Sequence, residues 1–175
     1  MKNIQLFLSI LVFLIAACNQ VPTNNETNIL DGQYIEKNKD GIITVIGHFD
    51  NGKREGQFMY FDTKGKLQTQ ENYVNGQLHD IQITVHNTGK INKRINYVNG
   101  VKEGDYTIYY KTGKLQETGS YKNGEKDGEI IWYYETGQKN IVYTYLNGKL
   151  NGPTQEFSKD GVIIDQGSYL NGEKQ

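Results

Sequence analysis

Thiol and imidazole side chains, which suit nucleophilic and metal chemistry, are few in this chain. They are the one cysteine, Cys18, and three histidines, His48, His79 and His86. A catalytic or metal site needs such groups to converge with further partners. The histidines lack a metal-like spacing with other ligands, and the chain has no His-Glu-x-x-His, Gly-x-Ser-x-Gly or phosphate-binding glycine loop. The sequence therefore predicts no catalytic residue, no metal site, no cofactor and no enzymatic activity.

Cys18 has a context that gives it another role. Lys2 precedes an almost wholly apolar stretch, Ile4 to Ala17, which is too short for a spanning helix and typical of a signal peptide. The stretch ends Ala16-Ala17-Cys18, which resembles the lipobox of bacterial lipoproteins, where the cysteine is lipidated. We predict a signal peptide at 1–17, then the lipidated cysteine and a flexible tether at 18–30. The implied location is the bacterial cell envelope, at the outer membrane in a Gram-negative cell; the alternative is an ordinary signal peptide with a stray cysteine.

The elements that follow are set by a sequence repeat of constant length. Asn-Gly recurs six times at one fixed spacing, and two further glycine columns keep the same period. We predict six units from 31 to 174: 31–54, 55–78, 79–102, 103–126, 127–150 and 151–174. The Asn-Gly pairs are Asn51-Gly52, Asn75-Gly76, Asn99-Gly100, Asn123-Gly124, Asn147-Gly148 and Asn171-Gly172.

Each unit reads as a pair of strands joined by tight turns. Asn-Gly is typical of a type I′ hairpin, because both central residues need positive φ. The second turn, such as Thr112-Gly113, also fits a two-residue loop. Runs between the turns, such as 106–110, are rich in aromatic and β-branched residues. The predicted fold class is all-β: a single-layer, elongated antiparallel β-meander built from six 24-residue hairpin repeats, about 55 Å long.

Counting outward from the turns predicts the strand register. Tyr121 lies opposite Gly104, and the same count pairs an aromatic residue with a glycine in every unit except the third, where Tyr97 faces Asp80. A ring lying over a glycine would cover the exposed backbone and explain both columns. Side-chain alternation then places a set of mostly apolar residues on one face: Tyr106, Ile108, Tyr110, Leu115 and Tyr121.

These repeats resemble the bacterial variant of the membrane occupation and recognition nexus (MORN) repeat. The resemblance covers residues 31–174 and rests on the pattern from Gly104 to Leu115, followed by Gly119-Ser120-Tyr121-Lys122-Asn123-Gly124. It implies an elongated antiparallel sheet with an interaction role. Some members of the family resemble antitoxins that neutralise a partner toxin.

The aromatic residues concentrate in the central units. We predict that a protein partner binds there, with Tyr110, Trp132 and Tyr134 as anchors and Ile108 and Tyr143 beside them, because exposed aromatic surface is typical of interaction sites. The alternative interpretation is that the aromatic rings pack over neighbouring strands and stabilise the sheet. A ring can have both roles, because a single-layer sheet leaves part of it uncovered. Stacking on sugars stays open as a variant.

The charge of the chain is nearly balanced, at −1, which gives no long-range attraction to nucleic acid. Unit 79–102 is the local exception, since four basic residues face one acidic residue, a balance of +3. Lys90, Lys93 and Arg94 form a candidate basic patch for an acidic partner or a lipid headgroup, or else a solvated surface.

Two functions remain from the sequence. The first is a non-enzymatic, lipid-anchored interaction scaffold at the cell envelope, attached to the membrane through its N-terminal lipid and bound to an unknown protein partner. The alternative is an immunity protein or antitoxin that neutralises one toxin. The export signal favours the first, because an exported protein could not reach a cytosolic toxin.

Overall fold

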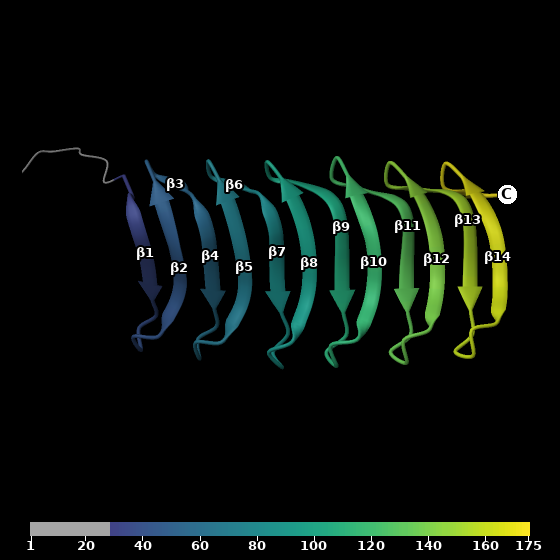
Figure 1. Cartoon of the computed structure of the whole chain (residues 1–175), viewed down its shortest axis with the longest axis horizontal. Helices are drawn as coiled ribbons and strands as arrows, with labels where there is room; N and C mark the ends of the chain where they lie inside the picture. The colour runs from purple at the N-terminus through teal and green to yellow at the C-terminus, as the bar shows by residue number, and fades with distance from the viewer. Residues whose placement is uncertain (1–28) are drawn as a thin grey trace, which may run out of the picture.

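Residues 29–175, the part of the chain described by the computed structural model, form one open sheet of 15 antiparallel strands without a helix (Figure 1). The predicted all-β, single-layer meander is confirmed. Each long strand pairs with the next along the chain. The long strands are β1 (Gly32–Lys37), β2 (Ile43–Asp50), β4 (Gly56–Phe61), β5 (Leu67–Val74), β7 (Asp80–Val85), β8 (Ile91–Val98), β9 (Val101–Tyr109), β10 (Leu115–Lys122), β11 (Glu125–Tyr133), β12 (Lys139–Leu146), β13 (Lys149–Phe157) and β14 (Ile163–Leu170).

Three short strands complete the sheet: β3 (Lys53–Arg54), β6 (Gln77–Leu78) and β15 (Glu173–Lys174). Each follows an Asn-Gly turn and pairs with the strand before that turn. In the later units the equivalent residues run on into a long strand, as at the start of β9, β11 and β13. β3 and β6 are therefore the same element, interrupted before the strand that follows.

The Asn-Gly turns have the predicted backbone. Asn123 has φ of 51° and Gly124 has φ of 86°, and the closing pair is Lys122 with Glu125. All six Asn-Gly pairs have positive φ at both residues, with the asparagines between 47° and 53°. These are two-residue type I′ loops, whose twist matches that of the flanking strands.

The prediction of two-residue loops at the second turn is wrong. Gly113 N donates to the Tyr110 carbonyl at 2.8 Å, and Tyr110 N donates to the Lys114 carbonyl at 2.8 Å, so Lys111, Thr112 and Gly113 form a three-residue loop. Gly113 has φ of 88°, which a type I turn followed by a left-handed residue requires. The same pair of hydrogen bonds recurs in all six units.

The predicted register is confirmed nevertheless, because a bulge restores it. Leu115 pairs with Tyr109 beside the loop, but beyond the bulge Glu117 pairs with Ile108 and Tyr121 pairs with Gly104, as expected. Paired residues share a face of the sheet, and Tyr109 and Ile108 point to opposite faces. Leu115 is therefore on the face of Tyr109, and its predicted placement beside Tyr121 is wrong.

The explanation offered for the glycines opposite the rings is also wrong. Gly104 has φ of 80°, and a Cβ there would have only the Asn96 amide nitrogen within 4 Å, at 3.9 Å. At Gly152, a Cβ would meet Thr144 at 3.1 Å, which lies on the face opposite Tyr145. These glycines are required by a left-handed backbone and not by a covering ring.

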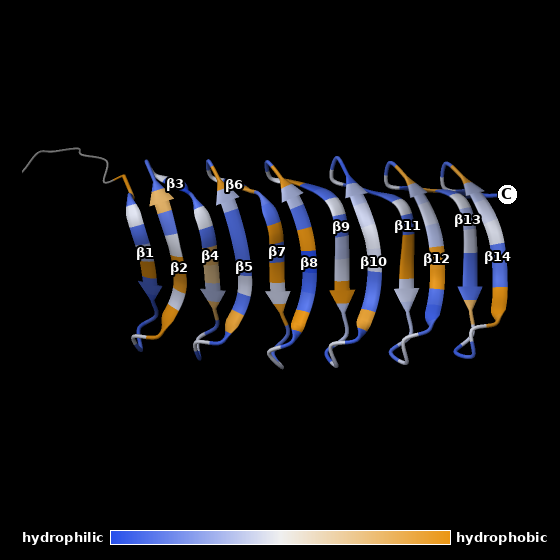
Figure 2. Ribbon diagram, viewed as in Figure 1, coloured by the Kyte–Doolittle hydropathy of each residue, from blue (hydrophilic) through white to orange (hydrophobic). Residues whose placement is uncertain are grey.

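The most buried side chains lie on the aromatic face of this one layer. Phe58, Tyr106 and Ile130 are 1%, 2% and 0% exposed, and they occupy the same position in the second, fourth and fifth units. Val142, on the opposite face, is 7% exposed. Hydrophobic residues lie near the middle of β7, β8, β11 and β12, so the apolar content runs along the array rather than gathering in one core (Figure 2).

Candidate functional site

Small residues let the large side chains of the aromatic face lie flat. A Cβ on Gly119 would collide with Ile130 Cδ1 and would stand 3.0 Å from the Tyr106 ring. Gly47 has the same relation to Phe58. This glycine column has ordinary φ, so its purpose is close packing and not backbone conformation. This column was not predicted from the sequence repeat, because the same position holds Glu71 and Tyr143 in other units.

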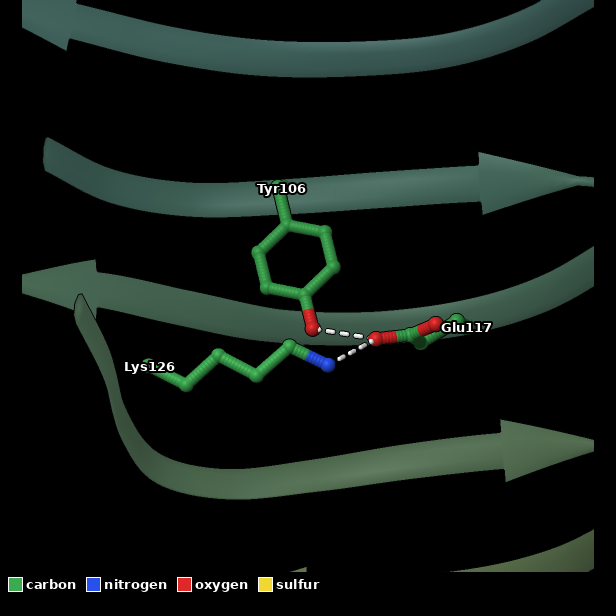
Figure 3. A network of polar contacts seen from close by, with 3 residues as sticks. All are labelled: Tyr106, Glu117 and Lys126. Atoms are coloured by element: carbon green, nitrogen blue, oxygen red, sulfur yellow. Dashed lines mark hydrogen bonds and ion pairs between the residues drawn. The ribbon is translucent and has the colours of Figure 1, made fainter. Parts of the chain in front are cut away.

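The centre of the aromatic face holds a polar network (Figure 3). The Tyr106 hydroxyl from β9 donates to Glu117 Oε1 on β10 at 2.5 Å, and Lys126 Nζ from β11 donates to the same oxygen at 2.7 Å. Burial, followed by the hydrogen bond to Glu117, raises the pKa of the Tyr106 phenol, which stays protonated at neutral pH. One carboxylate thus ties three neighbouring strands together.

Lys126 is also surrounded by aromatic rings. Its Nζ lies 5.0 Å from the centroid of Trp132, 5.8 Å from that of Tyr106 and 5.7 Å from that of Tyr145. A cation over ring faces at this range is attracted by the ring quadrupole. The network was not predicted from the sequence, because its members come from three different strands. In the sequence, Lys126 is recognisable only as a residue that follows an Asn-Gly turn.

Two other units repeat the arrangement of a cation on rings. Arg54 lies 5.2 Å from the Phe58 centroid and 5.1 Å from that of Tyr73, and it donates to the Tyr73 hydroxyl at 2.8 Å. Tyr73 in turn donates to Glu71 at 2.6 Å. At the end of the third unit, Lys102 Nζ lies 4.9 Å from the ring centroid of Tyr121 in the fourth. These cations come from equivalent positions, just after an Asn-Gly turn.

The structure divides the predicted anchors into two groups. Trp132 and Tyr143 pack edge to face, with centroids 5.8 Å apart, and Ile108 is half-buried on the same face. The Tyr143 hydroxyl donates to Glu156 at 2.8 Å, and this hydrogen bond, followed by burial, raises the pKa of Tyr143 to about 12. We call Tyr106, Tyr121, Trp132, Tyr143 and Tyr145, with Lys126 and Glu117, the aromatic cluster.

Tyr110 and Tyr134 lie outside this cluster, in the loops after β9 and β11. The Tyr110 hydroxyl donates to the Tyr133 carbonyl at 2.6 Å, and the Tyr134 hydroxyl donates to the Phe157 carbonyl at 2.7 Å. Both side chains are half-buried and bridge to the backbone of the following unit. Their role in the structure is to join neighbouring units.

The three basic residues do not form one patch. Lys93 and Arg94 are adjacent in β8, so their side chains point to opposite faces of the sheet. Lys90 Nζ donates to the Thr112 carbonyl at 2.5 Å and is thereby held against the next loop. The prediction of a joint site of Lys90, Lys93 and Arg94 is wrong for this reason.

A column of acidic residues beside the Asn-Gly turns has a structural role. Glu103 Oε2 accepts the backbone N–H of Asn123 at 2.7 Å, and Glu55 accepts that of Asn75 at 2.8 Å. In the third unit His79 Nδ1 lies 3.4 Å from Asn99 N. The residue at this position holds the Asn-Gly turn at the end of its own unit.

Residues 29–175 contain no group of three or more His, Cys, Asp or Glu side chains that could hold a metal ion. No helix in the same part of the chain is long and apolar enough to cross a membrane. Cys18 and the predicted signal peptide lie outside the described residues, so lipidation of Cys18 stays a prediction.

Three segments of the chain match the MORN repeat variant: residues 54–75, 102–123 and 126–149. The matches support MORN-type repeats at these three places in the chain. Each matched segment begins at one of the cations that lie on aromatic rings, Arg54, Lys102 or Lys126.

No curated protein matches the sequence. Among solved structures, the crystal structure of the GtfA/B complex bound to UDP and GlcNAc aligns at 15% identity over 72% of this chain, with a TM-score of 0.28. The aligned part is 25% of that chain, and a likeness this low carries no argument about fold or ligand.

Proposed function

We propose that this protein is a non-enzymatic, lipid-anchored scaffold of the bacterial cell envelope that binds a protein partner through its aromatic cluster. The observation that supports this most directly is the single layer. In residues 29–175 no second sheet or helix covers the aromatic face, so Trp132 and Tyr143 stay partly exposed although they are packed against each other. Trp and Tyr are the residues most often found at binding hot spots.

The charges in the cluster favour a partner with polar groups around an apolar centre. Lys126 and Glu117 are paired with each other, and their side chains are 28% and 12% exposed. The rings beside them therefore present an apolar surface bordered by a satisfied ion pair. Interfaces commonly have this composition, with an aromatic centre and a polar rim.

Binding is tested by replacing Trp132 and Tyr143 with serine in the lipidated protein and comparing pull-downs from envelope extracts. We expect loss of a specific partner, while Tyr169→Ser, in the last unit, serves as the matched aromatic control. Equal capture by the wild type and a folded Trp132→Ser/Tyr143→Ser variant contradicts the proposal. Capture of a toxin whose effect the protein suppresses instead favours the immunity role.

The anchor is tested separately at Cys18. Because stable attachment generally needs more than one acyl chain, we expect a multiply acylated N-terminal cysteine. Cys18→Ala is expected to release the protein from the membrane fraction or to block its maturation. Unchanged fractionation, with no lipid mass on the N-terminal peptide, contradicts the anchor and leaves the binding proposal standing.

A further inference from the structure

One end of the sheet carries a series of side chains that each reach the next unit, which we call the loop ladder. It consists of His86, Tyr110 and Tyr134, which occupy the same position in three successive units. His86 Nε2 donates to the Tyr109 carbonyl at 2.9 Å, as the two tyrosine hydroxyls do to the carbonyls of Tyr133 and Phe157. In each case a ring bridges two loops and satisfies a backbone acceptor of the following unit.

The ladder does not extend back to the second unit, which has Asp62 at this position. Asp62 Oδ1 accepts the backbone N–H groups of Lys64 at 2.8 Å and Lys66 at 2.9 Å, inside its own loop. These donors hold the pKa of Asp62 below its ordinary value, so the side chain has no proton to donate at neutral pH. Within residues 29–175, no side-chain hydrogen bond reaches the Val85 carbonyl, the acceptor in the equivalent position.

A hollow of about 440 Å³ lies between the loops of the second and third units. Leu67 and Val85 give it apolar walls, while Asp62, His86 and Thr88 give it polar edges. One unit earlier, Ile42 occupies the position equivalent to Lys66 and lies 3.4 Å from where a Cβ on Gly65 would stand. A second hollow lies between the loops of the third and fourth units, but there His86 already donates to the Tyr109 carbonyl. The hollow at Val85 differs in that no side chain of the preceding unit reaches its carbonyl acceptor.

We propose that this hollow binds a tyrosine side chain of a partner protein. The inserted ring takes the place that Tyr110 and Tyr134 take in the fourth and fifth units, packs between Leu67 and Val85, and donates its hydroxyl to the Val85 carbonyl. This rests on the proposed scaffold function and assigns it a second contact point, at the loop end of the sheet rather than in the aromatic cluster.

The hydroxyl is the discriminating feature. A phenylalanine ring has the same apolar area but leaves the carbonyl without a donor, and a buried acceptor without a partner costs free energy. A tyrosine ligand should therefore bind more tightly than a phenylalanine ligand. A single side chain buries little area, so affinity in the millimolar range is expected for an isolated amino acid derivative.

The test uses the full-length chain with Cys18→Ser, labelled with ¹⁵N, and N-acetyl-tyrosinamide as the probe. We expect saturable shifts of the Leu67, Val85 and His86 amide resonances, with at least several-fold weaker binding of N-acetyl-phenylalaninamide. Asp62→Tyr should abolish these shifts and raise the melting temperature, because the chain then supplies its own ring. The absence of saturable shifts, equal affinity for the two probes, or undiminished binding by folded Asp62→Tyr overturns the proposal.

A second variant tests the same idea from the opposite direction. Tyr110→Ala removes a ring of the loop ladder and should open an equivalent hollow, so the probe should also shift the resonances around Leu115 and Tyr133. A folded Tyr110→Ala protein without this second site contradicts the mimicry between chain and ligand. The titrations need no natural partner and use a site outside the aromatic cluster, so their failure does not bear on binding by that cluster.

Discussion

Glycine at two positions of the repeat answers two different physical demands. Gly104 has φ of 80° and almost nothing near its missing Cβ, whereas Gly119 has ordinary φ but is crowded by Ile130 and Tyr106. The first needs the conformational freedom of glycine and the second needs its small volume. The two columns should therefore respond differently to substitution.

Asp80 is the exception in the first column and should be improved by glycine. It has φ of 62°, which strains a residue with a Cβ, although aspartate tolerates it better than most. Asp80→Gly should raise the free energy of unfolding by up to about 1 kcal/mol, and Gly104→Asp should lower it by a similar amount. Chemical denaturation of the pair measures both. Stability that moves the other way in either variant would show that side-chain contacts, and not φ, decide these positions.

Gly119→Ala should destabilise the fourth and fifth units. The added methyl group needs the space of Ile130 Cδ1, and overpacking of this kind costs about 1–3 kcal/mol. Ile130→Val, which removes one methyl group, should recover part of the loss when combined with Gly119→Ala. Thermal melts of the single and double variants provide the comparison, and simple additivity of the two losses would contradict a direct clash.

At the scale of the strands and turns, local residue chemistry predicted the hairpins only in part. Asn-Gly determines its own loop, because both residues must have positive φ. Thr112-Gly113 does not, since one glycine suits either a two-residue loop or the third position of the observed one. The predicted strand register is nevertheless correct, because a bulge at Gln116 offsets the extra loop residue and places Tyr121 opposite Gly104.

For the aromatic cluster, alternation along the strands predicted which residues share a face of the sheet, but not which contacts they make. Trp132 and Tyr143 share a face and are in contact, as expected from their parity. The roles of Tyr110, Lys126 and Glu117 were not predicted, because they depend on how far a long side chain reaches across neighbouring strands. Sequence spacing fixes which face a residue occupies but not which partner its terminal atoms meet.

The carboxylate that holds each Asn-Gly turn should contribute measurably to its hairpin. Glu103→Ala removes the acceptor of the Asn123 N–H, and a hydrogen bond at an exposed turn contributes about 0.5–1.5 kcal/mol. Hydrogen exchange of the Asn123 amide should accelerate along with the loss of stability. Glu129→Ala, at an exposed position of β11, is the control; an equal effect there would indicate a general loss of charge instead.

Residues 29–175 form a slab one strand layer thick. Twelve long strands about 4.8 Å apart and about 26 Å long give a radius of gyration of roughly 18 Å, against roughly 15 Å for a compact chain of the same length. Small-angle scattering of a chain that starts at Ile29 should give the larger value. The smaller, compact-chain radius would mean that the sheet folds back on itself in solution, which would cover the aromatic face.

The hydrogen bonds between units have constant offsets along the chain. Side chains of the loop ladder reach carbonyls 23 residues ahead, and Glu103 accepts from a backbone N–H 20 residues ahead. Removing one whole unit, such as 103–126, therefore leaves every remaining donor facing an acceptor of the same kind: His86 would meet the Tyr133 carbonyl in place of that of Tyr109. Duplicating a unit has the same property. The length of the sheet can thus change in whole steps of about 10 Å, two strand spacings, without a new kind of contact having to arise, and the span between the two proposed binding points changes with it.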